Sequence, residues 1–467
     1  MLKRIRDLLI GKNRTSAGNP PSTGTVEALA EPPPEPAVRR GPEVVHRPIA
    51  REELDPDAVK IIQRLTRFDH GAYLVGGCVR DLLLDRKPKD FDIGTSATPR
   101  QIKRLFRNSR IIGRRFRLAH IYFQNGKIIE VATFRAQDDG DAVGDGGNGR
   151  GDLLIRDDNQ FGTMEQDALR RDFTINSLFY DVNAETVLDH SDGLGDLRRR
   201  TIRTIGDPDV RFKEDPIRIL RAIKFAARLD FDIERETRRA LYATRDEIPK
   251  AAAPRILEEI NRFCRGGAAR RSFELMRENG VFEIVLPELA AAYGDDERVW
   301  KLLYRFLERF DARIGGGGGE VQTGQILAAL LLPALMSDLG FHFDGSVARP
   351  ESSDLGAAID RYRRPLAARL RASRRDQEQC RQLLLTLERL VPRDRLHRNT
   401  KRALSRRLAL ADAMDLLHGL GAVLGGEFSA SARAWEGEAG GRDRRSHGDS
   451  RGTPAVPSDP APPARGT

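Results

Sequence analysis

The spacing of apolar residues changes along the chain and divides it into regions. Val59, Ile62 and Leu65 recur at helical intervals after Asp55, which predicts an amphipathic helix there. Four short runs rich in β-branched and aromatic residues predict strands: AYLV (72–75), FDI (91–93), HIYF (120–123) and IIEVATF (128–134). From Met164 onward the spacing is mostly helical, with strand-like runs near 178–188 and 201–205. We therefore predict a small N-terminal α/β domain followed by a long helical part.

Segments without an apolar period mark where order is expected to begin and end. Residues 15–45 are rich in Pro, Gly, Ala and Glu, and residues 435–467 are of low complexity, and both compositions are typical of disorder. The Gly/Asp stretch 138–152 and the GGGGG at 315–319 are predicted to be loops. The predicted regions are a disordered leader (1–50), an α/β domain (51–195), two helical regions (196–265 and 266–434) and a disordered tail (435–467).

Composition and charge narrow the class of protein. The 467 residues suffice for about three domains, and no run of about 18 apolar residues is present that would span a membrane. The start, MLKRIRDLLIGKNR, is a poor secretory signal, with a helix lying on a membrane surface as the alternative. Cys78, Cys264 and Cys380 are odd in number and far apart, which indicates a reducing cytoplasm. A net charge of +10 indicates an anionic partner, with nucleic acid as the first candidate.

The first chemical motif is LVGGCVRDLLL at 74–84, in which a strand runs into two glycines and then a helix. Gly76 and Gly77 would let the backbone turn sharply and approach a phosphate, and the helix start offers free N–H groups. Arg80 lies in the first turn of this helix. A simple tight turn is the alternative interpretation of this string.

The second motif is KPKDFDIG at 87–94, where Asp90 and Asp92 alternate with apolar residues. On a strand both carboxylates would point to one face, an arrangement that a divalent cation stabilises. An exposed turn is the alternative, but the nearby glycine pair favours a metal site beside a phosphate cradle. Glu130, in IIEVATF, would join this cluster if its strand pairs with the DxD strand, and a salt-bridged or rim carboxylate is the alternative.

Two further strings carry Arg and carboxylate side chains close together. DALRRDFTINSLFYD (167–181) holds Arg171 and Asp172, a pair suited to ribose and phosphate, with Asn176 four residues later. RFKEDPIRILRAIKFAARL (211–229) places Asp215 and Arg218 one turn apart, where they can form a hydrogen-bonding edge for a base. A helix cap is the alternative for the first string. For the second, whose helix carries the basic stripe Arg218, Arg221, Lys224 and Arg228, it is a solvated helix face.

These strings, in this order, resemble the class II nucleotidyltransferases, the superfamily of bacterial poly(A) polymerases and CCA-adding enzymes. The shared motifs cover about residues 70–230, and GRRFRLAHIYF (113–123) and LLIRDDNQFGTMEQDALRRDFTINSLFYD (153–181) favour the poly(A) polymerase branch. No HD-type histidine pair, which some CCA-adding enzymes carry, is found in the C-terminal half. The resemblance implies an α+β fold, with a nucleotidyltransferase head of mixed β-sheet and helices followed by an all-helical neck, body and leg.

The resemblance also implies roles for the matching positions. Gly76, Gly77 and Arg80 would hold the triphosphate of the incoming nucleotide, and Asp90 and Asp92 would bind two Mg²⁺ ions. Asp172 is expected, ahead of Glu130, to complete the acidic set. Arg171 and Asn176 would lie at the nucleotide, and Asp215 and Arg218 would read its base.

The implied function is template-independent addition of AMP from ATP to RNA 3′ ends by a cytoplasmic, monomeric enzyme. The same chemistry in a CCA-adding enzyme is the alternative, and a non-catalytic RNA-binding protein on the same scaffold is the remote one. The basic excess lies in residues 361–410, which hold 15 Arg and one Lys against four acidic residues. We expect Arg371, Arg374 and Arg375 there to grip the RNA backbone, with a solvated helix face as the alternative.

Overall fold

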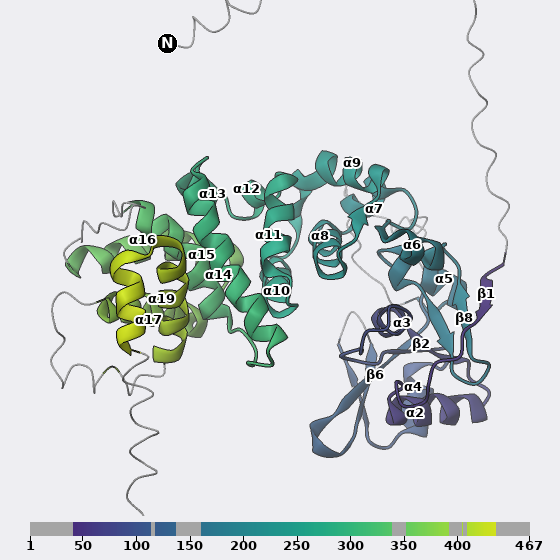
Figure 1. The fold of residues 1–467 in the computed structure, drawn as a ribbon. Helices are drawn as coiled ribbons and strands as arrows, with labels where there is room; N and C mark the ends of the chain where they lie inside the picture. Colours follow the sequence, from purple (N-terminus) through teal and green to yellow (C-terminus); the bar gives the residue numbers. More distant parts are fainter. Residues whose placement is uncertain are drawn as a thin grey trace, which may run out of the picture. The chain divides into compact units, whose positions relative to one another are not determined.

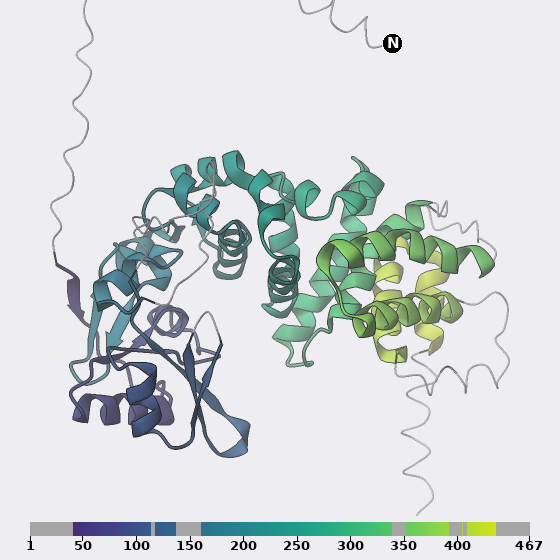
Figure 2. The ribbon, with the colours of Figure 1, turned by 180° about the vertical axis from the view of Figure 1, so that it is seen from behind.

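The computed structural model describes residues 41–113, 117–136, 160–338, 352–391, 404 and 409–435. The predictions for residues 1–40, the loop 138–152 and residues 436–467 lie outside the described residues. The chain divides into two units, Met1–Gly41 and Pro42–Thr467, and all elements below belong to the second unit. Figure 1 shows these elements, and Figure 2 shows them from behind.

A mixed eight-stranded sheet forms the head, as predicted, with the strand order β1-β8-β7-β2-β3-β6-β5-β4. β3 runs parallel to β6, and every other neighbouring pair is antiparallel. The strands are β1 (Glu43–His46), β2 (Ala72–Val75), β3 (Ile93–Thr95), β4 (Ser109–Ile112), β5 (Leu118–Tyr122), β6 (Ile128–Thr133), β7 (Phe179–Asp181) and β8 (Thr186–Asp189).

The predicted disordered leader, 1–50, is wrong at one point. Residues Glu43–His46 form strand β1, which pairs antiparallel with β8 at the edge of the sheet. This strand is mostly exposed and is held by the open backbone groups of β8, so its four residues carry no apolar alternation. The order of the head therefore begins before Asp55.

Helices cover one face of this sheet, and the period-2 pattern decides which residues face them. α2 (Pro56–Arg67) and α4 (Pro99–Leu105) pack on the side of Leu74, Ile93 and Val131, all fully buried. The helix predicted after Asp55 is thus confirmed, and Asp55 caps its first turn.

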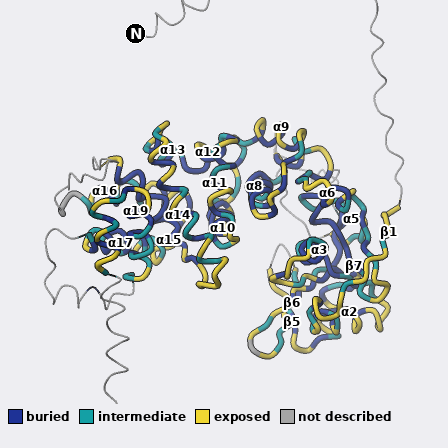
Figure 3. The backbone as a smooth tube through the Cα atoms, viewed as in Figure 1, coloured by how far each residue is buried: buried dark blue, intermediate teal, exposed yellow. Residues whose placement is uncertain are grey.

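The other face is covered in part. α5 (Met164–Leu169) contributes Ala168 to a second small core with Val75, Phe134 and Phe179. Buried residues alternate with intermediate ones along β5 and with exposed or intermediate ones along β6, so this face is less covered there (Figure 3). The boundary between the covered and the open part lies at β3 and β6.

The chain after the sheet is almost entirely helical, as expected. It contains α6 (Gly193–Arg199), α7 (Pro208–Glu214), α8 (Ile217–Leu229), α9 (Arg235–Thr244), η3 (Arg245–Lys250), α10 (Ala253–Arg265), α11 (Ala269–Glu278), α12 (Phe282–Val285), α13 (Pro287–Tyr293), α14 (Glu297–Gly315), α15 (Thr323–Asp338), α16 (Ser352–Leu370), α17 (Arg374–Leu390) and α19 (Leu410–Leu424). Two short strands, β9 (Thr201–Ile202) and β10 (Asp232–Ile233), pair in parallel between them. α15 is apolar on all sides because α13, α14, α16 and α17 surround it.

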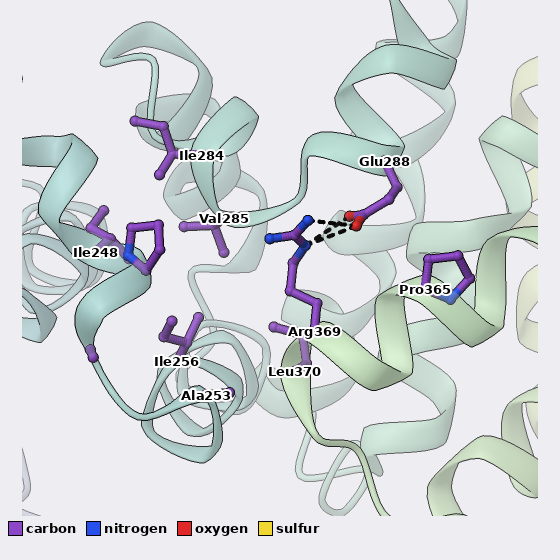
Figure 4. A pocket seen from close by; sticks show the side chains of 11 residues that line it. Ile248, Ala253, Ile256, Ile284, Val285, Glu288, Pro365, Arg369 and Leu370 are labelled. Atoms are coloured by element: carbon purple, nitrogen blue, oxygen red, sulfur yellow. Dashed lines mark hydrogen bonds and ion pairs between the residues drawn. The ribbon is translucent and has the colours of Figure 1, made fainter.

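A pocket of about 440 Å³ lies among η3, α10, α12, α13 and α16. Its lining is mainly apolar, and the ion pair between Glu288 and Arg369, 2.7 Å, joins α13 to α16 there (Figure 4). None of the predicted site residues lines it.

Candidate active site

Gly76 forms the turn between β2 and α3 (Gly77–Leu83), and its backbone has φ +73° and ψ −125°. A Cβ at this position would lie only 2.9 Å from Nη1 of Arg171. At Gly77, by contrast, a Cβ would meet only Nη2 of Arg80, at 3.7 Å. Glycine is therefore required at position 76 by its backbone and by the close guanidinium, whereas position 77 tolerates a side chain.

Asp90 and Asp92 lie just before β3 rather than inside a strand, which corrects the predicted strand at 91–93. The Asp92 carbonyl nevertheless accepts a hydrogen bond from the Val75 N–H at 3.0 Å, so Asp92 continues the sheet register. In that register Ile93 lies opposite Val131 on parallel β6, which makes Glu130 the neighbour of Asp92 on the same face. The condition set for Glu130, that its strand pairs with the DxD strand, is met.

The Asp92 carboxyl reaches solvent but is closely surrounded by protein. This partial desolvation, together with repulsion from Glu130 and Asp90, raises the pKa of Asp92 to about 6, although the Arg171 charge lowers it. Crowded carboxylates of this kind are stabilised by a cation. Glu130 also forms an ion pair with His120, at 3.3 Å between Oε1 and Nε2.

Two carboxylates fit a Mg²⁺ ion, which typically takes one or two protein carboxylates and completes its shell with substrate phosphates and water. Across the part of the chain that the structure describes, no three His, Cys, Asp or Glu side chains gather closely enough to hold a metal ion. The pair Asp90 and Asp92 has the donor chemistry that such a Mg²⁺ site needs.

Arg171 is held in place by Asp167, which the sequence analysis did not single out. Oδ2 of Asp167 accepts hydrogen bonds from Nε and Nη2 of Arg171, and Oδ1 accepts from Arg170. The Arg171 guanidinium also stacks over the Phe179 ring at 5.3 Å. The sequence did offer a signal for this contact. Asp167 precedes Arg170 by three residues and Arg171 by four, the spacings at which side chains meet along a helical turn. Arg171 thus stands fixed between the Gly76 turn and Asp92.

Arg80 is buried, and its guanidinium donors are engaged with protein. Nε and Nη2 donate to Oδ1 of Asp81 at 2.9 and 2.6 Å, and Nη1 donates to Oδ1 of Asn176 at 2.6 Å. The ring of Phe225 on α8 lies 5.1 Å from its Cζ. The structure therefore places Arg80 beneath the Gly76–Gly77 turn, as a support for it.

Asp172 contacts α8 and Asn176. Its Oδ2 accepts a hydrogen bond from Nε of Arg221 at 2.6 Å, and its Oδ1 accepts one from Nδ2 of Asn176 at 3.1 Å. Burial alone would raise the pKa of Asp172, but Arg221, Asn176 and Arg218 together lower it to about 2. Of the two carboxylates weighed as the third acidic residue, Glu130 lies beside Asp92 in the parallel register and Asp172 is held by Arg221 and Asn176, and the choice of Asp172 stays a prediction.

The basic stripe on α8 is not a solvated face. Each of its side chains pairs with a carboxylate from another element: Arg218 with Glu214 (3.0 Å), Arg221 with Asp172 (2.6 Å), Lys224 with Glu259 (2.7 Å) and Arg228 with Asp81 (3.2 Å). The pairs with Asp172 and Asp81 attach α8 to the head. Because Arg80 and Asn176 link those two aspartates, the contacts form a closed ring.

The Arg218 N–H donates to the Asp215 carbonyl at 3.0 Å, and the side chains of Asp215 and Arg218 each bond to other residues. Both oxygens of Asp215 pair with Arg255 on α10, at 3.0 and 2.8 Å. Nη1 of Arg218 donates to the carbonyl of Arg211 at 2.8 Å and to Glu214. Arg255, a residue that the motif analysis missed, is thus the direct partner of Asp215.

Arg371, between α16 and α17, and Arg374 and Arg375, in the first turn of α17, are exposed and form no ion pair with a described residue. Neighbouring arginines are neutralised: Arg361 pairs with Asp338, Arg363 and Arg364 pair with Asp360, and Arg369 pairs with Glu288. Arg374 and Arg375 also begin α17, whose N-terminus is itself positive. This places unneutralised positive charge in the helical part.

Residues 72–203 match the family model described as "Poly A polymerase head domain". Residues 72–203 are thus similar to this head domain. Residues 230–293 match a second model, described as "Probable RNA and SrmB-binding site of polymerase A". The resemblance to the nucleotidyltransferase superfamily is thereby confirmed.

Curated relatives fall into the same two groups that the motifs indicated. The chain is 43% identical over 273 residues to poly(A) polymerase I of Salmonella typhi, covering 57% of this chain and 58% of that protein. It is 33% identical over 264 residues to a CCA-adding enzyme of Lactobacillus delbrueckii subsp. bulgaricus, covering 54% of this chain and 64% of that protein. The match therefore spans somewhat more than half of each relative.

Solved structures support the fold. A tRNA nucleotidyltransferase complexed with a primer tRNA and an incoming ATP analog has a TM-score of 0.58 at 22% identity, covering 82% of this chain and 99% of that chain. A CCA-adding enzyme in an apo form has a TM-score of 0.57 at 22% identity, covering 82% of this chain and 84% of that chain. Separately, none of the helices in the described ranges is both long and apolar enough to cross a membrane.

Proposed function

We propose that the protein is a polynucleotide adenylyltransferase, which adds AMP from ATP to RNA 3′ ends without a nucleic-acid template. The observation that supports this proposal is that the Gly76 turn, Arg171 and Asp92 lie close together. They lie where β2 ends and the neighbouring antiparallel strand β3 begins. The higher identity to poly(A) polymerase I than to CCA-adding enzymes supports adenylation over CCA addition.

In the proposed reaction the RNA 3′-hydroxyl oxygen attacks the α-phosphorus of ATP. One O–P bond forms, the bond between the α-phosphorus and the bridging oxygen breaks, pyrophosphate leaves, and the hydroxyl proton passes to water. Mg²⁺ bound at this site would supply charge neutralisation and a more acidic 3′-hydroxyl. The chain's own part is to orient the two substrates and to place opposite charges around the phosphates.

Each residue of the site receives a task in this proposal. Asp90 and Asp92 would hold the metal through their carboxylate oxygens, and Glu130 lies beside Asp92. Arg171, fixed by Asp167, neutralises charge on the triphosphate above the Gly76 turn. Arg80, Asn176 and Asp172 keep that turn in register with α8.

We assign the selection of the base to the region of Asp215 and Arg218, at the start of α8. Arg255 and Glu214 hold these two side chains in fixed orientations, and a fixed donor and acceptor set discriminates strongly between bases. ATP would thus be chosen by the protein itself.

We further propose that the exposed Arg371, Arg374 and Arg375 contact the RNA backbone, and that the enzyme acts as a monomer in the cytoplasm. The three cysteines are free and buried, which suits a reducing compartment.

Incubation of the purified protein with Mg²⁺, a generic RNA and one labelled nucleoside triphosphate at a time tests the function. Long tails from ATP alone are expected. Addition of two C and one A to a truncated tRNA, with no long tails, would establish the CCA-adding alternative instead. Asp92→Ala, as the control, is expected to abolish adenylation and keep RNA affinity, and normal turnover by this variant would refute the metal assignment.

A further inference from the structure

One face of strands β4, β5 and β6 is open, although the opposite face of the same strands is buried. The buried side carries Ala119, Ile121 and Val131, each with no exposed surface. The open side carries Arg110, His120 and Tyr122, with the exposed Ile112 and Ile128 at its margins. Glu130 is the one acidic side chain among the residues of these three strands.

These side chains form a continuous row that starts at the acidic cluster. Glu130 lies beside Asp92 and contacts His120. The His120 and Tyr122 rings are 6.4 Å apart, and the Arg110 guanidinium lies over the Tyr122 ring at 5.6 Å. The register, which sets Arg110 opposite His120 and His120 opposite Glu130, keeps the row on one face.

The strand order decides from which side the RNA 3′ end can reach the Asp90 and Asp92 carboxylates. The Gly76 turn follows β2, Asp92 precedes β3, and the row begins on β6 and continues over β5 to β4. Displacement at phosphorus sets the attacking and the leaving oxygen roughly in line on opposite sides. With the triphosphate at the Gly76 turn, the attacking hydroxyl enters from the β6 side.

We propose that the Arg110–Tyr122–His120 row is the binding platform for the single-stranded RNA 3′ end, and this inference rests on the proposed function. The last nucleotides stack on Tyr122 and on the guanidinium plane of Arg110, whose charge also meets a phosphate. Aromatic rings and guanidinium planes are the groups on which unpaired RNA bases stack, with little preference for sequence. A platform of this kind suits an enzyme that accepts many RNA ends.

Fluorescence anisotropy with a labelled oligoadenylate RNA tests the platform in the full-length protein. Arg110→Ala and Tyr122→Ala are expected to raise the Kd, and the KM for RNA, about tenfold, as for the loss of one stacked base. The KM for ATP should stay unchanged, and Tyr122→Phe should restore binding. Arg64→Ala is the matched control, because Arg64 stacks over Phe106 at a similar 5.7 Å on the helices of the opposite face.

Crosslinking of the unmodified protein gives an independent measurement. An RNA with 4-thiouridine at its penultimate nucleotide should label the tryptic peptide of residues 118–127, which contains His120 and Tyr122. Labelling confined to the helical part, or a Kd and a KM for RNA unchanged in both alanine variants, would overturn the platform and leave the adenylation assay valid. If the wild-type protein crosslinks at 118–127 but incorporates no nucleotide, the platform stands and the proposed function fails.

Discussion

The Asp172 carboxylate and the Arg221 guanidinium meet at 2.6 Å, and this contact joins the RRDFT segment of the head to helix α8. A carboxylate that sequence motifs place at the catalytic centre thus has a structural partner on a helix 49 residues later. The contact continues through Asn176 and Arg80 to Asp81, which pairs with Arg228 on the same helix. The Gly76 turn and helix α8 are therefore held as one unit.

Arg221→Gln is expected to lower the free energy of unfolding by about 2 kcal/mol at pH 7, because it leaves the poorly exposed Asp172 carboxylate without its countercharge. Urea unfolding followed by circular dichroism measures this change. Arg239→Gln is the control, since Arg239 forms an exposed ion pair with Asp209 and its replacement should cost little stability. Equal losses of unfolding free energy in the two variants would contradict a buried, stabilising ion pair between Arg221 and Asp172.

The same contact predicts an acid dependence. The pKa of Asp172 is about 2 in the folded protein and near 3.8 when unfolded, so its stabilising contribution is present above pH 4 and is lost as the pH falls toward 2. In Arg221→Gln the buried carboxyl loses the charge that lowers its pKa, so the difference in unfolding free energy between wild type and variant should be largest above pH 4 and should shrink as the pH falls toward 2. A difference that stays constant from pH 7 to pH 2 would show that Arg221 does not set this pKa.

Gly76→Ala is expected to raise the KM for ATP at least about tenfold, because the new Cβ would displace the Arg171 guanidinium and strain a backbone with φ +73°. Steady-state kinetics at varied ATP measures the effect. Gly126→Ala is the control for backbone strain alone. Gly126 has φ +75°, but a Cβ there would have nothing within 4 Å, so this variant has the strain without the displaced guanidinium. Gly77→Ala should change little, and a loss in it equal to that of Gly76→Ala would contradict the role of Arg171.

Asp92→Asn is expected to make the metal-free protein more stable at pH 8. The pKa of Asp92 is raised to about 6 in the folded state, so its ionised form costs stability above pH 6, and this cost disappears as the pH falls toward 4. The gain should be about 1 kcal/mol or less, since the carboxyl reaches solvent. Urea unfolding in EDTA at pH 8 and pH 4 measures it. A variant less stable than the wild type at pH 8 would assign Asp92 a structural role.

Joint replacement of Arg371, Arg374 and Arg375 by Gln should weaken RNA binding and flatten its dependence on salt, because fewer phosphate contacts release fewer counterions. Titration at several NaCl concentrations gives the slope. The control is the triple change of Arg363, Arg364 and Arg369 to Gln, which removes the same charge from arginines already paired with carboxylates. Identical slopes in the two triple variants would attribute the effect to net charge alone.

The local motifs could be interpreted from the sequence because their chemistry depends on short-range spacing. A strand ending in Gly76 and followed by a helix needs only neighbouring residues, and so do the DxD pair and the helix after Asp55. The mixed sheet, the helical remainder and the superfamily followed from these motifs. The edge strand β1 escaped prediction because its stability comes from a backbone partner more than a hundred residues away.

Long-range pairing, in contrast, is decided only by the fold. Glu130 and Asp172 are both carboxylates, and nothing in the sequence shows which of them lies near Asp92. Only the parallel register of β3 and β6 places Glu130 beside Asp92. Likewise the basic stripe on α8 has the pattern of a solvated face, yet each charge meets a carboxylate brought in by another element. The sequence by itself determined which chemical groups this protein has and their local geometry. The tertiary structure decided which groups act together, because an ion pair depends on distance in space and residue spacing does not encode that distance beyond a few turns.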